Sequence, residues 1–258
     1  MTQPCRPAQP ALGWDPASLR DPHAHADKAE RVRAMFDAIA PTYERVNTIA
    51  TCGRDAVWRR RAAVAAAVRP GDVILDVACG TGDMIRAFAR CAPVAGRIIG
   101  VDFARAMLAR GDYRTIETTV ELIEADALHL PLPEGSVDVI SCAFGVRNFQ
   151  DLAAGLREMA RVARPGARVV ILEFARPENP LLRRAYELYC DAVLPRLGRL
   201  IAGDRVGAYR YLPKSVQTFE PPRAMIGRLQ AAGFGDVRMQ SMNLGGVVLY
   251  RGVKPSSG

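Results

Sequence analysis

Three acidic residues stand where apolar segments of the chain end, and each segment has the character of a buried strand. Asp76 lies in LDVACGTGD, Asp102 closes RIIGVD, and Asp126 closes VELIEAD. Because the carboxyl ends of parallel strands meet at one edge of a sheet, where open α/β sheets bind ligands, the three carboxylates are expected to face one site. Carboxylates attract a cationic ligand and repel a phosphate.

The glycine-rich turn CGTG (79–82) narrows the choice of ligand. Gly80 and Gly82 let a ligand approach the backbone, and the helix that follows offers free N–H groups at its start. Ile85 stands where a dinucleotide fingerprint needs its third glycine, and no Lys-Ser/Thr of a P-loop follows Gly82. S-adenosylmethionine carries a sulfonium and an ammonium group and no phosphate, so the residues predict this cofactor.

Each acidic residue has an expected role in such a site. Asp76 faces the cationic groups of the cofactor. Asp102, 20 residues after Gly82, accepts hydrogen bonds from both ribose hydroxyls, and we assign its neighbour Phe103 to the same site. Asp126 accepts a bond from the exocyclic amine of adenine. The alternative role of an Asp here is a helix N-cap or a turn, and it stays open for Asp126.

A second polar pair follows the apolar segment VDVISCAF (137–144). Arg147 and Asn148 come just after Gly145. An arginine and an asparagine at the end of a buried strand cost free energy unless a polar group meets them. We predict that both are catalytic and face the methyl donor. The alternative is that Arg147 pairs with an acidic residue and locks the loop.

The elements that position these residues alternate along the chain. Apolar runs that indicate strands occupy 73–78, 97–102, 120–126, 137–144, 167–175, 236–242 and 246–252, with helical segments between the first five. This order predicts an α/β fold: a Rossmann-like, mostly parallel, seven-stranded sheet with helices on both faces.

The rest of the chain is assigned to a tail and a lid. Residues 1–27 carry five prolines and no hydrophobic periodicity, which predicts a flexible tail. Residues 28–258 are expected to form a single domain. Helical regions at about 28–69 and 176–220 are predicted to cover the carboxyl edge of the sheet.

Composition bears on partners and compartment. A net charge of +8 favours anionic surfaces such as nucleic acid or acidic lipid, although a general bias toward arginine explains it equally well. The six cysteines show no metal-ligand spacing, so no metal is predicted. Without a secretory signal or an apolar run of about 20 residues, the chain is expected to be cytoplasmic.

Several motifs together resemble one enzyme family. They are FDAIAPTYERVN, LDVACGTGD, AFGVRNFQD, LREMARVARPG, LEFARP, LPRLGRLIAGD, YRYLPKS and VVLYRG. From about Arg33 to Lys254 the chain is similar to quinone-biosynthesis C-methyltransferases of the UbiE/MenG type. CGTG alone is typical of any class I methyltransferase, whereas AFGVRN, LPRLGRLIAGD and YRYL are far more specific.

The resemblance implies a class I methyltransferase fold and a polyprenylated quinol substrate. The quinol would be methylated at a ring carbon, giving menaquinol or a ubiquinone precursor. The implied cofactor contacts are Thr81, Asp102, Asp126, Ala127 and Ala143. Serine is frequent in the family where this chain has Ala143.

The same resemblance bears on the substrate pocket. Tyr43, Asn47 and Trp58 match the N-terminal motif of the family, whereas Asp55 stands where histidine is usual. Tyr43 is expected to be catalytic and Asn47 to bind substrate. Substrate contacts are also expected at Tyr209 and Tyr211, for which packing within the lid is an equal alternative.

The chemistry sets what these residues must do. Methyl transfer from a sulfonium is an in-line displacement, so the enzyme contributes mainly by aligning two bound reactants. A hydroquinone carbon becomes more nucleophilic as the ring hydroxyl loses its proton. Arg147 is placed to stabilise the developing phenolate or to hold a water that takes the proton.

Other readings stay open. The 180–201 segment mixes Leu181, Tyr186 and Val193 with arginines, and it either faces a bilayer surface or packs as a lid helix. A homodimer is a further possibility. An RNA methyltransferase is the main rival, but FGVRN occupies the place of the Asn/Asp-Pro-Pro-aromatic motif of amino-group enzymes, and we expect no nucleic-acid partner. A non-catalytic S-adenosylmethionine-binding protein is disfavoured by the intact CGTG turn.

Overall fold

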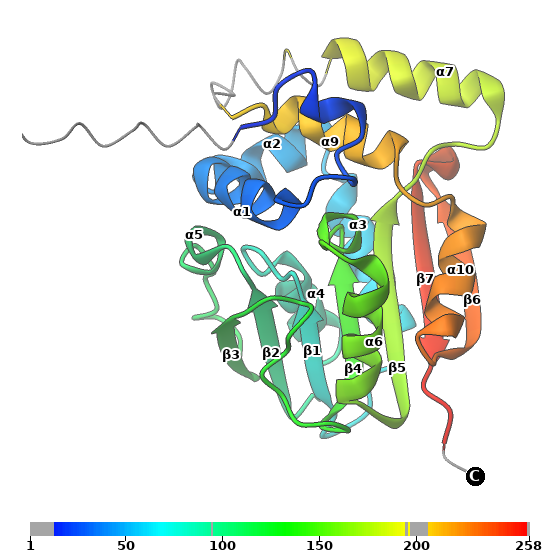
Figure 1. The fold of residues 1–258 in the computed structure, drawn as a ribbon. Coiled ribbons are helices and arrows are strands. Elements are labelled where there is room, and N and C mark those ends of the chain that lie inside the picture. Colours follow the sequence, from blue (N-terminus) through cyan, green and yellow to red (C-terminus); the bar gives the residue numbers. More distant parts are fainter. Residues whose placement is uncertain (1–12, 94, 194–195, 197–205, 257–258) are drawn as a thin grey trace, which may run out of the picture.

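Seven strands form one sheet in the order β3-β2-β1-β4-β5-β7-β6 in the computed structural model (Figure 1). The structure describes residues 13–93, 95–193, 196 and 206–256. The strands are β1 (Val73–Val77), β2 (Arg97–Asp102), β3 (Thr119–Glu124), β4 (Val137–Ala143), β5 (Ala163–Phe174), β6 (Gly235–Met242) and β7 (Val247–Val253). The first five are mutually parallel, and β7 is antiparallel to both β5 and β6. The predicted fold class is confirmed.

The chain reverses its direction of travel across the sheet next to β1. Strands β1 and β2 pair on one side, and β4 pairs with the other edge of β1. Such a switch point leaves a crevice at the carboxyl ends of the two central strands. The register puts Asp76 of β1 opposite Ser141 of β4, so two polar side chains meet just below that crevice.

Helices cover both faces of the sheet (Figure 1). Helices α6 (Leu152–Val162) and α10 (Pro222–Ala231) pack on one face through residues such as Leu156 and Met225. Helices α3 (Arg54–Ala65) and α4 (Asp83–Cys91) pack on the other through Ala62 and Phe88. The strands are buried on both faces, which is why their sequences are continuously apolar.

A helical cap lies over the carboxyl ends of the strands (Figure 1). It contains α1 (Lys28–Ile39), α2 (Tyr43–Ala50), α7 (Pro180–Leu188) and α9 (Ala208–Gln217), with a π-helical turn at Tyr189–Val193. Short helical turns at Ser18–Arg20, Arg105–Leu108, Val146–Asn148 and Asn243–Gly245 complete the described helical segments. A small core of its own, with Val32, Met35 and Tyr209, holds the cap together.

The described part of the predicted flexible tail is packed, which corrects the expectation for residues 13–27. Trp14 is 1% exposed and stacks on Tyr211, with ring centroids 4.4 Å apart. The Nε2 of His23 lies 2.9 Å from the carbonyl oxygen of Ser215. Trp14 and Leu19 anchor this segment in the core of the cap, and two residues leave no periodic pattern for sequence reasoning to detect. Residues 1–12 lie outside the described residues.

The predicted lid helix at 180–201 is also divided. Helix α7 ends at Leu188, the π-helical turn follows it, and most of 194–205, including the LPRLGRLIAGD motif, lies outside the described residues. Among the described helices, none has the length and apolar character needed to cross a membrane.

Candidate active site

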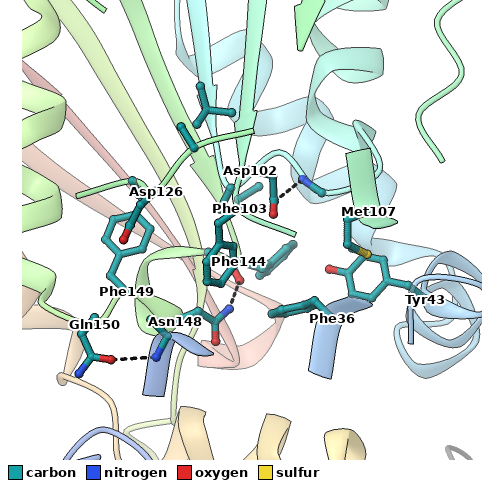
Figure 2. A pocket seen from close by; sticks show the side chains of 18 residues that line it. Phe36, Tyr43, Asp102, Phe103, Met107, Asp126, Phe144, Asn148, Phe149 and Gln150 are labelled. Atoms are coloured by element: carbon teal, nitrogen blue, oxygen red, sulfur yellow. Dashed lines mark hydrogen bonds between the residues drawn. The ribbon is translucent and has the colours of Figure 1, made fainter. Parts of the chain in front are cut away.

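An open cavity lies at the carboxyl edge of the sheet, where the central strands end; we call it the strand-edge cavity (Figure 2). The sheet contributes the predicted cofactor residues Gly80, Asp102, Phe103, Asp126, Ala127 and Ala143 to its lining. The cap contributes Phe36 and Tyr43. Six residues chosen from four separate segments of sequence therefore lie around one space, as the strand-end rule predicts.

The turn after β1 is held in an unusual backbone conformation. Gly80 and Gly82 have φ of 57° and 85°, and the non-glycine Ala78 has φ of 54°. A Cβ on Gly82 would lie 2.1 Å from the hydroxyl oxygen of Tyr113, so any other residue there would have to displace this side chain as well as adopt the positive φ. Gly82 itself does not line the cavity, and it serves to close the turn beneath the space that Gly80 lines.

Asp102 is oriented by the backbone. The amide of Gly80 donates to its Oδ2 at 2.8 Å (Figure 2). The amide of Ala104 donates to Oδ1 of Asp102, also at 2.8 Å. Burial raises the pKa of Asp102 to about 6, against the effect of these amide donors. Each carboxylate oxygen has a second lone pair, so a diol such as the two ribose hydroxyls can still be bound.

Asp76 and Thr81 lie just outside the lining of the cavity and have unmet hydrogen-bonding capacity. Ser141 donates to Asp76 Oδ1 at 2.6 Å. Asp76 Oδ2 and the Thr81 hydroxyl are buried without a hydrogen-bond partner in the part of the chain that the structure describes. Burial raises the pKa of Asp76 to about 7. Buried polar atoms left without partners fit a polar, cationic ligand such as S-adenosylmethionine.

Arg147 is engaged in a buried ion pair. Its Nη1 lies 2.6 Å from Glu173 Oε1, and both side chains are 2% exposed. Nη1 also donates to the carbonyl of Phe144 at 2.6 Å, and Nε donates to the hydroxyl of Ser215 at 3.3 Å. Burial alone would lower the pKa of Arg147, but the charge of Glu173 outweighs it and the net shift is upward. This geometry matches the alternative in which Arg147 locks the loop.

The side chain of Asn148 lies on a different side of the loop after β4 from that of Arg147. It lines the strand-edge cavity, and its side-chain oxygen accepts a hydrogen bond of 2.9 Å from the hydroxyl of Tyr211. Its amide nitrogen lies 3.5 Å from the carbonyl oxygen of Phe144, to which it donates (Figure 2). The predicted polar pair is therefore divided between two cavities.

The second cavity is also open and lies between the cap and the far side of the loop after β4; we call it the cap cavity. Helices α2 and α3 contribute Asn47, Asp55 and Trp58 to its wall. Arg147 lines it as well. Tyr43 and Phe144 line both cavities, so the two spaces meet at these side chains.

An aromatic wall runs along the cap cavity. Phe144 and Phe174 stack with ring centroids 4.3 Å apart, and Trp58 approaches both rings edge-on. Phe144 adopts φ of 60°, an uncommon conformation that for a non-glycine residue costs on the order of 1 kcal/mol or more. The strained backbone places this ring between the two cavities.

Tyr209 and Tyr211 line neither cavity. Both are buried in the cap core, where helix α9 packs against the Trp14 segment, α1 and the β4 loop. Their position matches the alternative of packing within the lid. Tyr211 still reaches the site indirectly, through its hydrogen bond to Asn148.

Sequence reasoning missed three polar residues of the site: Ser141, Glu173 and Arg59. Glu173 stands one residue before the end of an apolar strand, in LEFARP, so the rule that found Asp102 would have found it. Ser141 depends on strand register and Arg59 on helix packing, and neither leaves a signal in the local sequence.

Asp76→Asn tests the electrostatics of this site. Burial keeps a proton on Asp76 up to about pH 7, whereas an unfolded chain releases it near pH 4. The folded state then binds more protons, so its stability falls as pH rises from about 4 to about 7, by at most about 1.4 kcal/mol per pH unit. The free energy of unfolding, measured with denaturant at several pH values in this range, should fall less steeply with pH for Asp76→Asn than for the wild type.

The measurement is the difference in pH dependence between variant and wild type, because the raised pKa of Asp102 also makes stability fall as pH rises in both proteins. Glu117→Gln, at an exposed position, is the control and should keep the wild-type slope. A wild-type slope in Asp76→Asn would show that Asp76 is already charged in the folded protein.

Solved structures resemble this chain in fold. A putative methyltransferase in complex with the Trm112 activator from Haloferax volcanii superposes with a TM-score of 0.62 at 19% identity, covering 85% of this chain and 97% of that one. A putative methyltransferase from Bacillus halodurans reaches 0.56 at 16% identity, covering 77% and 99%. Both agree with the class I methyltransferase architecture.

Curated relatives are closer in sequence. The "Ubiquinone/menaquinone biosynthesis C-methyltransferase UbiE" of Teredinibacter turnerae is 38% identical over 89% of this chain and 93% of its own length. The "Demethylmenaquinone methyltransferase" of Thermus thermophilus is 43% identical over 86% of this chain and 100% of its own. The model of the ubiE/COQ5 methyltransferase family matches residues 24–254. On this evidence the chain belongs to the ubiE/COQ5 methyltransferase family and is an S-adenosylmethionine-dependent methyltransferase.

Proposed function

We propose that this enzyme methylates a ring carbon of a polyprenylated quinol, converting demethylmenaquinol to menaquinol, or acting on the 2-polyprenyl-6-methoxy-benzoquinol of ubiquinone biosynthesis. The observation that carries the proposal is the meeting of two cavities at Tyr43 and Phe144. Acidic strand ends line the first cavity beside aromatic rings, and the stacked aromatic wall lines the second cavity beside buried arginines. A cationic cofactor and an aromatic substrate therefore have separate spaces that share one boundary.

The strand-edge cavity is the proposed cofactor site. Asp102 would hold the ribose and Asp126 the adenine amine, while Gly80 and Ala127 offer backbone contacts. Ala143 has no side-chain hydrogen bond to offer, so its contact would be through the backbone or its methyl group. When bound, S-adenosylmethionine supplies an electrophilic methyl group on a positively charged sulfur.

The cap cavity is the proposed quinol site. Its aromatic wall suits a flat ring, because offset stacking and edge contacts with aromatic side chains are favourable. Asn47 and Tyr43 supply polar groups near the junction of the cavities. Burial raises the pKa of Tyr43, so its phenol stays protonated near neutral pH and acts as a hydrogen-bond donor.

The two members of the β4 loop take different roles in this proposal. Asn148 shapes the cofactor side and holds Tyr211 of the cap. Arg147 closes the wall of the quinol site and lies 5.5 Å from the centroid of the Phe174 ring. Because Arg147 is paired with Glu173, both charges can be removed together to test whether the guanidinium also acts on the substrate.

A transfer assay tests the reaction. Labelled S-adenosylmethionine is offered with reduced demethylmenaquinone, its oxidised form, a reduced ubiquinone precursor and bulk RNA. Label is expected in the reduced quinols only, since the oxidised ring lacks the electron density for attack on a methyl group. Label confined to RNA would refute the proposal, and no transfer to any acceptor despite cofactor binding would favour a non-catalytic protein.

Arg147 and Glu173 must be varied together to separate structure from catalysis. Arg147→Met leaves a buried carboxylate unpaired and should cost about 3–5 kcal/mol of unfolding free energy. The double variant Arg147→Met/Glu173→Gln removes both charges and should recover most of this loss.

The double variant then reports on catalysis. If Arg147 stabilises charge on the ring oxygen, the folded double variant binds cofactor within about 3-fold of the wild type and loses turnover about 10²-fold. Calorimetry and the transfer assay measure the two quantities. Equal losses in both would make Arg147 a structural residue.

Peripheral contact with a membrane is the third element of the proposal. Helix α7 lies at the outer end of the cap and has no buried residue (Figure 1). Leu181, Leu188 and Leu244 are 78%, 69% and 76% exposed, and Arg184 is exposed beside them. Tyr186 of the same helix lines the cap cavity, so a prenyl chain leaving this cavity could pass directly into lipid.

Co-sedimentation with vesicles tests this contact. Binding to anionic vesicles is expected to exceed binding to zwitterionic ones and to weaken with salt. Leu181→Asp/Leu188→Asp should lower it at least about 10-fold, because charged side chains replace apolar ones at the lipid boundary. Val64→Asp, at a 63% exposed position of α3, is the control. Salt-insensitive binding, or equal binding by all three proteins, would contradict the proposal.

The choice between the two quinone pathways, the cytoplasmic location, the homodimer and the absence of a nucleic-acid partner stay predictions.

A further inference from the structure

Arg59 is a buried cation in the wall of the cap cavity that sequence reasoning did not single out. It lies on α3, is 6% exposed and lines the cavity. Its guanidinium carbon is 5.1 Å from the centroid of the Phe144 ring. Since Phe144 lines both cavities, Arg59 lies close to the boundary at which methyl transfer has to occur.

Two nitrogens of the Arg59 guanidinium group make no hydrogen bond to the described residues. Nη2 lies 3.3 Å from Asp83 Oδ2, and Nη1 lies 3.8 Å from Asp55 Oδ2, beyond hydrogen-bond range. Nε and Nη1 are buried and have no hydrogen-bond partner among the residues that the structure describes. Buried donors of a charged group are rarely left unmet in a folded protein, so they indicate a bound acceptor.

Arg147 differs in this respect. Its Nη1 and Nε donate to Glu173, the Phe144 carbonyl and Ser215, and its charge is met by a carboxylate at 2.6 Å. Both guanidiniums lie against the stacked pair Phe144 and Phe174. Of the two, Arg59 is the one with buried donor nitrogens that have no partner among the described residues.

We propose that Arg59 is a catalytic residue that donates hydrogen bonds to the quinol ring oxygen on which negative charge develops. The inference rests on the proposed function. As the ring hydroxyl loses its proton to solvent, the charge left on oxygen is met by Nε and Nη1. The ring carbon would then give an electron pair to the methyl carbon, and the sulfur–carbon bond would break with its pair left on sulfur. Loss of the ring C–H proton to solvent would restore the aromatic ring as a phenolate, which takes up a proton from solvent on its oxygen to give the methylated quinol.

The same side chain connects the two sites. Asp83, the partner of Arg59 Nη2, begins helix α4 directly after the glycine-rich turn. Arg86 bonds to Asp83 at 2.5 Å and donates to the Thr81 carbonyl at 2.8 Å. A guanidinium fixed to the cofactor turn holds the ring oxygen at a set distance from the methyl donor, which is the alignment that the displacement needs.

Arg59→Met and Arg59→Lys test the proposal, with Arg60→Met as the matched control on an exposed position of the same helix. Arg59→Met is expected to lose about 10²-fold or more in kcat for reduced quinol, with cofactor affinity within about 3-fold of the wild type. Arg59→Lys keeps the charge but not the fork of donors, so it should recover part of kcat. Arg60→Met should match the wild type.

The outcomes separate this inference from the function on which it rests. Wild-type protein that methylates no quinol refutes the proposed function. Wild-type activity with unchanged kcat in Arg59→Met refutes the role of Arg59 alone. Should Arg59→Met fail to fold, Arg59→Met/Asp55→Asn removes the unpaired carboxylate and takes its place. Equal loss of kcat and cofactor affinity in a folded variant would assign Arg59 to the structure of the cofactor turn instead.

Discussion

The buried ion pair between Arg147 and Glu173 is the constraint on which both cavities depend. A buried guanidinium is tolerated only when an anion meets it with good geometry, and here the carboxylate comes from the neighbouring strand β5. The pair fixes the loop after β4, and the cap is attached to that loop. Lys28 Nζ donates to the Phe149 carbonyl at 2.5 Å, and Tyr211 donates to Asn148. The ion pair thus determines where the cap lies, and with it the boundary between the two cavities.

Carboxyl groups and guanidiniums flank this boundary on different sides, with one exception. Asp102 and Asp126 line the strand-edge cavity and Asp76 lies just outside it, whereas Arg59 and Arg147 line the cap cavity together with Asp55. Stabilising a sulfonium in the ground state does not speed its reaction, because only interactions that strengthen in the transition state do so. Burial raises the pKa of Asp76 to about 7, so near neutral pH this carboxyl is only partly ionised, which limits that stabilisation. A guanidinium near the ring oxygen acts earlier, because it raises the fraction of quinol that has lost its proton and can attack.

The sequence predicted the sheet well because its signals are local. A strand buried on both faces reads as a continuous apolar run, and polar residues just past its end mark the binding edge. That rule placed Asp102 and Asp126 around one cavity. It failed where the partner is remote: nothing near Arg147 names Glu173, 26 residues away, as the acid that meets it. Trp14 and Tyr211 likewise acquire their roles only by meeting across the cap.

Asp55 stands where histidine is usual in the family, and its position beside Arg59 gives a physical reason for the difference. The two residues are one helical turn apart on α3, and Asp55 Oδ1 accepts a bond of 3.0 Å from the Thr51 hydroxyl. At 3.8 Å its other oxygen offsets the charge of Arg59 without taking up a donor. A neutral imidazole at this position would leave more of that charge uncompensated, whereas a carboxylate at bonding distance would occupy the N–H groups that the cavity presents. Asp55 therefore offsets the buried charge of Arg59 and, in the proposed role of Arg59, leaves its donors free for a substrate oxygen.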